Sequence, residues 1–456
     1  MVYSIGLYKI GSSFWFNYEN SNTGTSLSNH KLHRTKTMML SIGLLLMAIL
    51  VLSCVSTSIF KQQNQALGQS YVQTLKYRNL VIDLGNGVKV KGQLTFPAIG
   101  KGPFPAVLLI HGSGAQDMNE TLAKNAKLFW QIAQYLSERG FAVLRFDKRG
   151  VGATSYTISN SNVWGNATAN DFVHDSQKAL NVLIQQPEVD PKRISILGHS
   201  EGTQYAPRVA IDNSTKVKNV ILMAALAQNP TKVVEYATDV SLPLEYAMQV
   251  LDKNHTGLIS IQQIAKAPVL LKFLSLPHSL VRANNTKAIS ATLGKDFGTS
   301  GYISIDKQLK PALIKTYQNI TAFNPSKCNN VALCPVLWRS LASMVPNLSI
   351  IGNVSKSTGI LILTGENDSQ TPVQDSFILQ QRLTDVKHPD HTLITYPNLG
   401  HSFYPSSRWS TTFGPIQPYV LADLYAWLEA HSGFKTPASS STMMPSSSIS
   451  NSSAHK

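Results

Sequence analysis

Ser200 stands between two glycines, in a setting that suits a nucleophile. It belongs to the segment GHSEG at 198–202, which follows an apolar run at 194–197 and precedes a helical pattern at 203–211. Glycines on both sides permit a sharp turn that exposes a serine hydroxyl above the end of a strand. The segment therefore predicts a serine nucleophile, provided that the chain also supplies a base, an acid and an oxyanion hole.

A suitable base and acid follow two other apolar runs. Asp368 ends the segment TGEND after the run at 360–363, and His401 lies in NLGHSF after the run at 392–396. A serine nucleophile needs a histidine that takes its proton and a carboxylate that orients this histidine. The chain order Ser, Asp, His is one of the orders in which such triads occur. Two other carboxylates compete for the role of the acid: Glu366 and Asp375.

A glycine-rich loop, HGSG at 111–114, follows a further apolar run at 106–110. A backbone N–H of this loop, together with the N–H of Glu201, can stabilise the negative charge that develops on a substrate oxygen. His111 and His199 lie beside glycines, in loops whose backbone has the functional role. Neither histidine is therefore expected to be the base.

The elements that position these residues alternate between strands and helices. Short apolar runs predict strands, the first two joined as a hairpin by GNG at 85–87: 81–84, 88–96, 106–110, 142–146, 194–197, 220–224, 360–363 and 392–396. Amphipathic patterns predict helices at 122–139, 171–185, 203–211, 373–383 and 419–430. This alternation indicates an α/β fold, a mostly parallel sheet covered by helices on both faces. The candidate residues all follow strand ends, where open α/β sheets place their sites.

The alternation stops at 227 and resumes near 351, which predicts an insertion that forms a helical lid above the site. The predicted domains are a disordered N-terminal segment (1–36), a transmembrane anchor or signal segment (37–60), a linker (61–75), a catalytic domain (76–226 and 351–434), the lid (227–350) and a disordered Ser-rich tail (435–456).

Three segments resemble the α/β-hydrolase family, and within it the dienelactone-hydrolase and acyl-peptidase-like serine esterases. They are HGSGAQDMNET (111–121), FAVLRFDKRGVGAT (141–154) and PEVDPKRISILGHSEG (187–202). The resemblance covers about 78–226 and 357–431. It implies an α/β-hydrolase fold, and it implies that DKRG at 147–150 is a structural loop without a catalytic role.

The resemblance also assigns roles to the candidate residues. It implies that Ser200 is the nucleophile, Asp368 the acid and His401 the base, and that Ser113 and Glu201 supply the oxyanion N–H groups. The family's usual glycine after the elbow is Thr203 here, which puts the packing of the following helix in doubt. Such a site needs no metal or organic cofactor.

The expected activity is hydrolysis of a small carboxylic ester through an acyl-enzyme. The same triad cleaves amide bonds, so a peptidase that acts on short peptides is the alternative within the enzymes. A catalytically silent hydrolase fold that serves as a surface binding protein is the alternative outside them. The net charge is +15, but long runs of Lys and Arg are absent, so we expect no nucleic-acid partner.

Residues 37–60 carry no charge and follow a basic flank at 31–36. About 20 apolar residues span a bilayer, and a basic flank stays on the inner side. We therefore expect a membrane-anchored or secreted protein with an extracellular catalytic domain. A cleaved signal peptide and lipidation at Cys54, in the partial lipobox VLSC, are the alternatives to a retained anchor.

Two further features suit export. Asn-x-Ser/Thr sequons, which are glycan acceptors in secreted proteins, occur at Asn119, Asn166, Asn213, Asn254, Asn284, Asn319, Asn347, Asn353, Asn367 and Asn451. Cys328 and Cys334 lie close enough to close a small loop outside the cell, or they are two free thiols.

Within the predicted lid, DKNHTGLISIQQ at 252–263 resembles an EF-hand loop. A second copy, DFGTSGYISIDK, occupies 296–307, and the shared G-x-I-S-I core predicts a short β-contact between the two. The candidate calcium ligands of the first loop are Asp252, Asn254, Thr256, Ser260 and Gln263. Gln263 stands where a bidentate Glu is usual. We therefore expect weak calcium binding at most, and a lid that no longer binds metal is the alternative.

Overall fold

The structure is a computed structural model, and it describes residues 74–229, 237–267, 270, 301–322, 328 and 334–433. The predicted anchor at 37–60, the N-terminal segment and the Ser-rich tail lie outside the described residues. Among the helices of the described part, none is long and apolar enough to cross a membrane.

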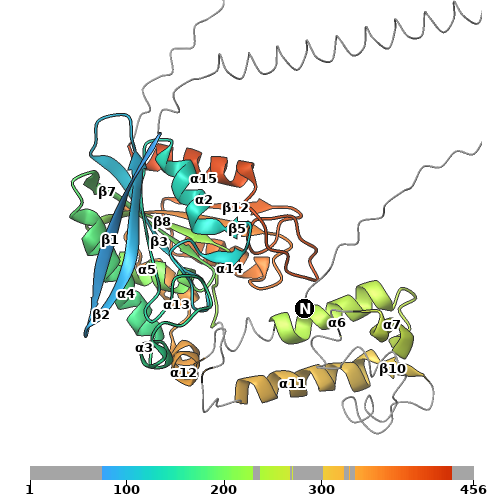
Figure 1. Ribbon diagram of the computed structural model, residues 1–456. Coiled ribbons are helices and arrows are strands. Elements are labelled where there is room, and N and C mark those ends of the chain that lie inside the picture. The colour runs from blue at the N-terminus through green and yellow to red at the C-terminus, as the bar shows by residue number, and fades with distance from the viewer. Residues whose placement is uncertain are drawn as a thin grey trace, which may run out of the picture. The chain divides into compact units, whose positions relative to one another are not determined.

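The central feature is an eight-stranded sheet with the strand order β1-β2-β6-β3-β7-β8-β11-β12 (Figure 1). Its strands are β1 (Leu75–Gly85), β2 (Val88–Pro97), β3 (Phe104–Ile110), β6 (Ala142–Phe146), β7 (Val189–His199), β8 (Val217–Met223), β11 (Gly359–Gly365) and β12 (His391–Tyr396). β1, β2 and β6 pair antiparallel, whereas the other neighbours pair in parallel. The predicted α/β fold with a mostly parallel sheet is confirmed.

Two strands are longer than their apolar runs. β1 begins at Leu75 rather than 81, and β7 begins at Val189 rather than 194. The added residues are mostly polar and half exposed, so no hydrophobic pattern marks them. Pairing with β2 extends β1, because each ladder bond satisfies a backbone group whatever the side chain is.

Helices cover both faces of the sheet, as predicted. One face carries α2 (Leu128–Ser137) and α15 (Pro418–His431), which pack on Val107 and Leu109. The other face carries α4 (Ala169–Ile184), α5 (Gly202–Asp212) and α14 (Val373–Asp385), which share a core with Leu108. Alternate residues of β3 thus enter opposite cores, which explains why the strand is apolar throughout.

The helix expected at 122–139 begins only at Leu128. Residues before it form a small hairpin of β4 (Thr121–Ala123) and β5 (Ala126–Lys127). The carboxylate of Asp117 accepts hydrogen bonds from the N–H and the hydroxyl of Thr121, at 3.1 and 2.9 Å. These hydrogen bonds between Thr121 and Asp117 fix a turn before the hairpin, so these residues do not form the helix that their sequence pattern predicts.

The described part of the insertion has a small apolar core of its own. It includes the helical segments η2 (Ala237–Ser241), α6 (Leu242–Tyr246), η3 (Ala247–Leu251), α7 (Ile261–Ala265), η4 (Ile305–Leu309) and α11 (Lys310–Ala322), and the strands β9 (Leu258–Ser260) and β10 (Tyr302–Ser304). Val240, Ile259, Ile303 and Leu309 are buried in this core. β9 pairs antiparallel with β10, with Ile259 opposite Ile303, so the predicted β-contact is confirmed. The role as a lid stays a prediction.

The C-terminal part of the insertion packs on the helices of the catalytic sheet. It comprises α12 (Pro335–Ser343), α13 (Asn347–Ile350) and η5 (Ile351–Asn353). The N–H of Ala169, at the start of α4, donates to Ser340 Oγ at 2.8 Å. Cys328 and Cys334 form a disulfide just before α12.

Several sequon asparagines have side-chain hydrogen bonds within the fold. Asn347 is fully buried, and its Nδ2 donates to the carbonyls of Thr203 and Leu226 at 2.7 and 2.8 Å. Asn119 Oδ1 accepts from the buried Arg145. A glycan at Asn347 is incompatible with the folded chain, which corrects that part of the export argument. By contrast, Asn166 and Asn353 are exposed.

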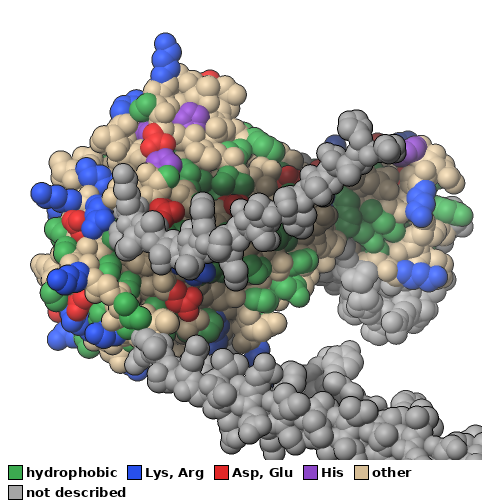
Figure 2. Space-filling view, turned by 90° about the horizontal axis from the view of Figure 1, so that it is seen from above, with side chains coloured by type: hydrophobic (Ala, Val, Ile, Leu, Met, Phe, Trp, Pro, Cys, Tyr) green, Lys and Arg blue, Asp and Glu red, His purple; other side chains and the backbone are tan. Residues whose placement is uncertain are grey.

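Basic side chains do not form one continuous band on the face seen in Figure 2. Among the described residues there, Lys and Arg are dispersed between apolar and uncharged side chains. The expectation that the protein binds no nucleic acid stays a prediction.

Candidate active site

Ser200 lies at the sharp turn between β7 and α5. Its φ is +53°, a left-handed value that is uncommon for a residue other than glycine. Its N–H donates to the carbonyl of Met223 on the neighbouring strand β8 at 2.9 Å. This bond holds a strained backbone in place, as is common at functional sites.

The glycines beside Ser200 are required for close backbone contact. A Cβ on Gly198 would lie 2.3 Å from the carbonyl oxygen of Gly202, and one on Gly202 would lie 2.2 Å from that of Ile110. Both distances are far below van der Waals contact. The two glycines therefore allow the backbones of β7, β3 and α5 to approach one another closely at the elbow.

Thr203, which replaces the family's usual glycine, fits the junction. Its hydroxyl donates to the carbonyl of Ser200 at 2.6 Å and accepts from the N–H of Leu226 at 3.1 Å. It is fully buried with both bonds made. The departure from the family pattern thus adds a hydrogen bond to the elbow instead of disturbing the helix.

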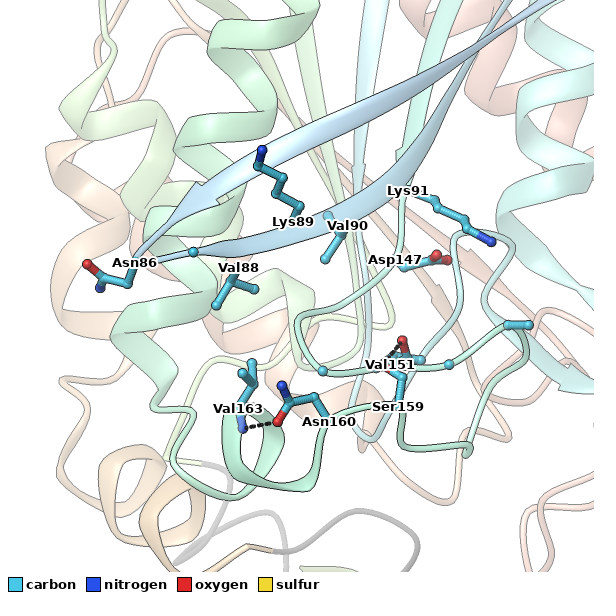
Figure 3. A pocket seen from close by; sticks show the side chains of 14 residues that line it. Asn86, Val88, Lys89, Val90, Lys91, Asp147, Val151, Ser159, Asn160 and Val163 are labelled. Carbon is cyan, nitrogen blue, oxygen red and sulfur yellow. Dashed lines mark hydrogen bonds between the residues drawn. The ribbon is translucent and has the colours of Figure 1, made fainter.

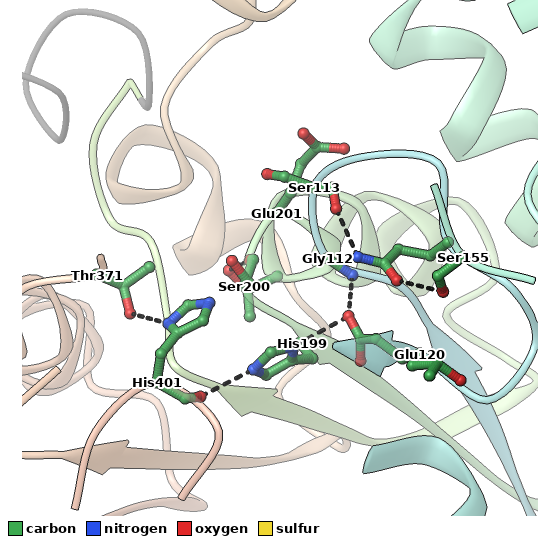
Figure 4. A network of polar contacts seen from close by, with 12 residues as sticks. Gly112, Ser113, Glu120, Ser155, His199, Ser200, Glu201, Thr371 and His401 are labelled. Atoms are coloured by element: carbon green, nitrogen blue, oxygen red, sulfur yellow. Dashed lines mark hydrogen bonds and ion pairs between the residues drawn. The ribbon is translucent and has the colours of Figure 1, made fainter. Parts of the chain in front are cut away.

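Asp368 and His401 form a buried pair at the ends of β11 and β12. Nδ1 of His401 lies 2.8 Å from Oδ2 of Asp368. The other oxygen of Asp368 accepts the N–H groups of Gln370 and Thr371 at 2.8 and 2.9 Å, and Thr371 Oγ1 donates to Oδ2 at 2.6 Å. In Figure 4 the imidazole of His401 lies beside Ser200. The three residues predicted as a triad therefore meet at one edge of the sheet.

The surroundings of Asp368 favour its ionised form. Burial alone would raise the pKa of this carboxyl, but the charge of His401 and the hydrogen bonds from His401 and Thr371 hold the pKa below its ordinary value. A carboxylate that stays ionised can orient a histidine and stabilise its protonated form.

The two competing carboxylates have other partners. Glu366 is exposed and accepts from Thr395 Oγ1 at 2.8 Å. Asp375 is buried and accepts the N–H groups of Ala227 and Gln228 at 2.8 and 3.3 Å. Burial raises the pKa of Asp375. Asp375 therefore anchors the chain where it leaves β8, and of the three carboxylates it is Asp368 that contacts His401.

The expected oxyanion donors flank Ser200. Ser113 is exposed in the loop after β3, and Glu201 follows Ser200 at the start of α5 (Figure 4). Within the described residues, no recorded hydrogen bond uses the backbone N–H of either residue. Both N–H groups are thus available to a developing oxyanion.

Two buried pairs of charged side chains surround this loop. Glu120 and His199 form one buried pair, with Oε1 and Nδ1 3.0 Å apart, and His199 Nε2 lies 3.1 Å from the carbonyl of His401. Lys148 and Glu201 form another, with Nζ and Oε1 3.2 Å apart. The residues were within the recognised segments, but their spacing in sequence gives no sign that they meet.

A hollow of about 540 Å³ lies on another side of the 147–152 loop, against β2 (Figure 3). Its lining includes Lys89, Lys91, Asp147 and Asn160. Burial raises the pKa of Asp147 to about 6, although the N–H of Met118 donates to it. None of the predicted catalytic residues lines this hollow.

In the predicted calcium loop, the carboxylate of Asp252 is hydrogen-bonded by residues of the loop itself. Asp252 accepts the N–H groups of Thr256 and Gly257 at 2.9 and 2.7 Å, and Thr256 Oγ1 at 2.9 Å. Gln263 Oε1 accepts the N–H of Ser260 at 2.8 Å. In the described part of the chain, no group of three His, Cys, Asp or Glu side chains could hold a metal. The start of the second copy, 296–300, lies outside the described residues.

Comparisons with known proteins agree on the fold. The family model described as alpha/beta hydrolase fold matches residues 105–407. Esterase EstD of Thermotoga maritima is 36% identical over 148 residues, which are 32% of this chain and 32% of EstD. Esterase FrsA of Yersinia pestis is 26% identical over 166 residues, 35% of this chain and 36% of FrsA. The matched region thus spans about a third of the length of these relatives.

Solved structures are similar at lower identity. Est1E from Butyrivibrio proteoclasticus with bound ferulic acid is 13% identical, with a TM-score of 0.46, over 78% of this chain and 100% of that chain. Dipeptidyl peptidase 4 of Porphyromonas gingivalis is 14% identical, with a TM-score of 0.43, over 79% of this chain and 36% of that chain.

Proposed function

Because the chain belongs to the alpha/beta hydrolase fold family, we propose that it is a serine hydrolase that cleaves carboxylic esters through Ser200, His401 and Asp368. One observation carries the proposal: the buried His401–Asp368 pair lies beside a serine that the elbow holds at φ +53°. A structural serine would not need the strained backbone, the glycines on both sides and an oriented histidine together.

In the proposed reaction, Nε2 of His401 takes the proton of Ser200 Oγ while this oxygen attacks the acyl carbonyl. Asp368 keeps the proton of Nδ1 in place and stabilises the imidazolium. The N–H groups of Ser113 and Glu201 stabilise the oxyanion. The alcohol leaves with the proton from His401, and the acyl group remains on Ser200. Water, deprotonated by His401, then releases the acid and restores the serine.

Esters are the favoured substrate class, since two relatives that are similar over about a third of this chain are named esterases. The same groups can cleave an amide, so short peptides are the alternative substrates. The insertion starts just after β8, next to the elbow, where Gln204 Nε2 of α5 donates to the carbonyl of Leu226 at 3.0 Å. We propose that it covers the site and favours small acyl esters.

The proposed location is the outside of the cell, with the protein anchored or secreted. The uncharged segment at 37–60 and its basic flank support this location. The disulfide between Cys328 and Cys334 supports it too, because such bonds persist mainly in oxidising compartments.

The test combines labelling and turnover. Purified protein is treated with a fluorophosphonate probe, the modified residue is mapped by mass spectrometry, and nitrophenyl esters and dipeptide amides are compared as substrates. We expect the label on Ser200 and a higher kcat/KM for esters. In Ser200→Ala, labelling should vanish and kcat should fall by several orders of magnitude with an unchanged Tm. Full activity in Ser200→Ala would refute the proposal, and higher kcat/KM for amides would make the protein a peptidase.

A further inference from the structure

The two peptide groups that flank the Cα of Gly112 are each held by a buried charged side chain. Its N–H donates to Glu120 Oε1 at 2.6 Å, and its carbonyl accepts from Lys148 Nζ at 2.5 Å. Gly112 immediately precedes Ser113, the expected oxyanion donor. The carbonyl of Gly112 and the N–H of Ser113 belong to the same planar peptide group, so the contact with Lys148 determines where the N–H of Ser113 points, while Glu120 fixes the preceding peptide group.

The same two side chains also reach the nucleophile elbow, one on each side of Ser200. Glu120 contacts His199, the residue before the serine, at 3.0 Å (Figure 4). Lys148 contacts Glu201, the residue after the serine, at 3.2 Å. Two ion pairs thus tie Gly112, a residue of the oxyanion loop, to both neighbours of the nucleophile.

All four charged side chains are removed from solvent. Glu120 is 0% exposed, His199 2%, and Lys148 and Glu201 3% each. Lys148 Nζ also lies 4.6 Å from the ring centroid of Phe172. Because buried charges are costly unless they are paired and hydrogen-bonded, this arrangement depends on every contact in it.

The space around Gly112 is too small for a larger side chain. A Cβ at residue 112 would lie 2.8 Å from Glu120 Oε1 and 3.1 Å from Ser200 Cβ. The loop and the elbow are therefore in direct contact, and a shift of either one changes the distance between the oxyanion donors and Ser200.

We propose that Glu120–His199 and Lys148–Glu201 are positioning pairs that set the geometry of the oxyanion hole by fixing Gly112 to both neighbours of Ser200. The proposal rests on the proposed serine-hydrolase function and gives Lys148, in the 147–150 loop, a positioning role. None of the four side chains reacts with the substrate. They act through the N–H groups of Ser113 and Glu201.

The decisive variant is Lys148→Met, which replaces the aliphatic part of the side chain by one of similar length and removes the Nζ donor. Losing one oxyanion donor lowers kcat by about 10²–10³. In Lys148→Met the donors are displaced rather than lost, so we expect kcat to fall by about 10², with KM nearly unchanged. The Ki of a trifluoromethyl ketone, which forms an oxyanion on Ser200, should rise by the same factor as kcat/KM falls.

A double variant separates positioning from stability. Lys148→Met alone leaves Glu201 buried without its cation, so Tm should fall. Lys148→Met combined with Glu201→Gln removes both charges, and Tm should recover. If the pair positions the loop, kcat stays low in the double variant, because Gly112 still lacks its donor. Recovery of kcat together with Tm would show a purely structural pair and overturn the proposal.

The matched control is Arg149→Met. Arg149 is the next residue of the same loop and forms ion pairs with Asp171 and Asp175, but no recorded contact joins it to Gly112 or Ser200. We expect a lower Tm with kcat within about threefold of the wild type. A loss of kcat equal to that of Lys148→Met would assign the effect to general packing of the loop and overturn the proposal.

The fluorophosphonate label distinguishes the two possible failures. Unlabelled Ser200 in the wild type refutes the serine hydrolase and the positioning role with it. Complete labelling of Ser200 in Lys148→Met, with normal kcat and normal Ki for the ketone, refutes the positioning role alone. Complete but slow labelling with low kcat supports both.

Discussion

His199 lies beside His401, with ring centroids 4.9 Å apart, and its Nε2 contacts the main-chain carbonyl of that residue at 3.1 Å. Its other ring nitrogen contacts the carboxylate of Glu120 at 3.0 Å. Both partners are acceptors, so both nitrogens must carry hydrogen, which is the imidazolium form. His199 is therefore a charged histidine next to the proposed base.

This relationship predicts an alkaline loss of activity. Burial would lower the pKa of His199, but the charge and hydrogen bond of Glu120, the carbonyl of His401 and the charge of Asp368 together raise it above 6.5. Burial would raise the pKa of Glu120, but His199, His111 and the N–H of Gly112 lower it below 4.5. Both side chains are charged at pH values between the lowered pKa of Glu120 and the raised pKa of His199. The ion pair is lost as the pH rises through the pKa of His199, because the imidazole then becomes neutral. We expect kcat to fall there, and profiles of kcat against pH for the wild type and His199→Gln test it. The variant should have a lower kcat without this alkaline limb. An identical limb in both would contradict the assignment.

The acid of the triad can be tested by matched carboxylate substitutions. Asp368→Asn keeps the shape but favours the wrong imidazole tautomer, which should lower kcat by up to about 10⁴. Glu366→Gln should change kcat by less than about threefold, because Glu366 is exposed and bonds Thr395. Steady-state kinetics on one nitrophenyl ester measures both. A larger loss in Glu366→Gln than in Asp368→Asn would reassign the acid.

The tight junction at the elbow predicts that Gly202→Ala is severely destabilising. The new Cβ would lie 2.2 Å from the carbonyl oxygen of Ile110, a backbone atom that cannot move independently. Overpacking in a core costs about 1–3 kcal/mol or more. Gly433→Ala is the control, since no atom lies within 4 Å of its Cβ and only its φ of +61° opposes the substitution, at about 1–2 kcal/mol. Urea unfolding should rank Gly202→Ala as the more harmful change, and equal losses would contradict this packing.

The loop at 252–263 should bind calcium only weakly, with a Kd in about the millimolar range. Asp252, the single carboxylate of the loop, already accepts three hydrogen bonds from Thr256 and Gly257, so little of its capacity is left to offset the dehydration of an ion. Isothermal titration calorimetry of the wild type and Asp252→Asn measures the affinity. Sub-micromolar binding that Asp252→Asn abolishes would overturn this expectation.

If the chain is exported, its sequons should be modified unequally. Asn166 and Asn353 are exposed, whereas Asn347 is buried and Asn367 adjoins Asp368, with its Nδ2 donating to the carbonyl of Ser406 at 2.8 Å. Glycopeptide mapping of protein from a glycosylating secretory host should find glycans at the first two positions and none at Asn347 or Asn367. Occupied Asn347 in folded, active protein would contradict the burial.

The sequence predicted the parallel sheet and brought the triad candidates to its edge because apolar strands and glycine turns are local signals. It could not predict β4 and β5, where one carboxylate, Asp117, redirects the chain. It also missed Lys148 and Glu120 as neighbours of the oxyanion loop. In sequence, Lys148 is 36 residues from Gly112 and Glu120 is 8 residues from it. Lys148 is 53 residues from Glu201 of the elbow, and Glu120 is 79 residues from His199. Such contacts depend on how whole helices and strands pack against one another, and no local sequence pattern indicates that packing.

The chain leaves the sheet and returns to it at almost the same point. The N–H of Leu348 donates to the carbonyl of Ala227 at 2.9 Å, and Asn347 Nδ2 donates to that of Leu226. The segment between these residues is thus a loop whose ends are already closed, and each doubling of a flexible loop costs only about 0.6 kcal/mol. The hydrolase scaffold can therefore exchange this segment for a shorter or longer one at a small entropic cost while the nucleophile stays in place.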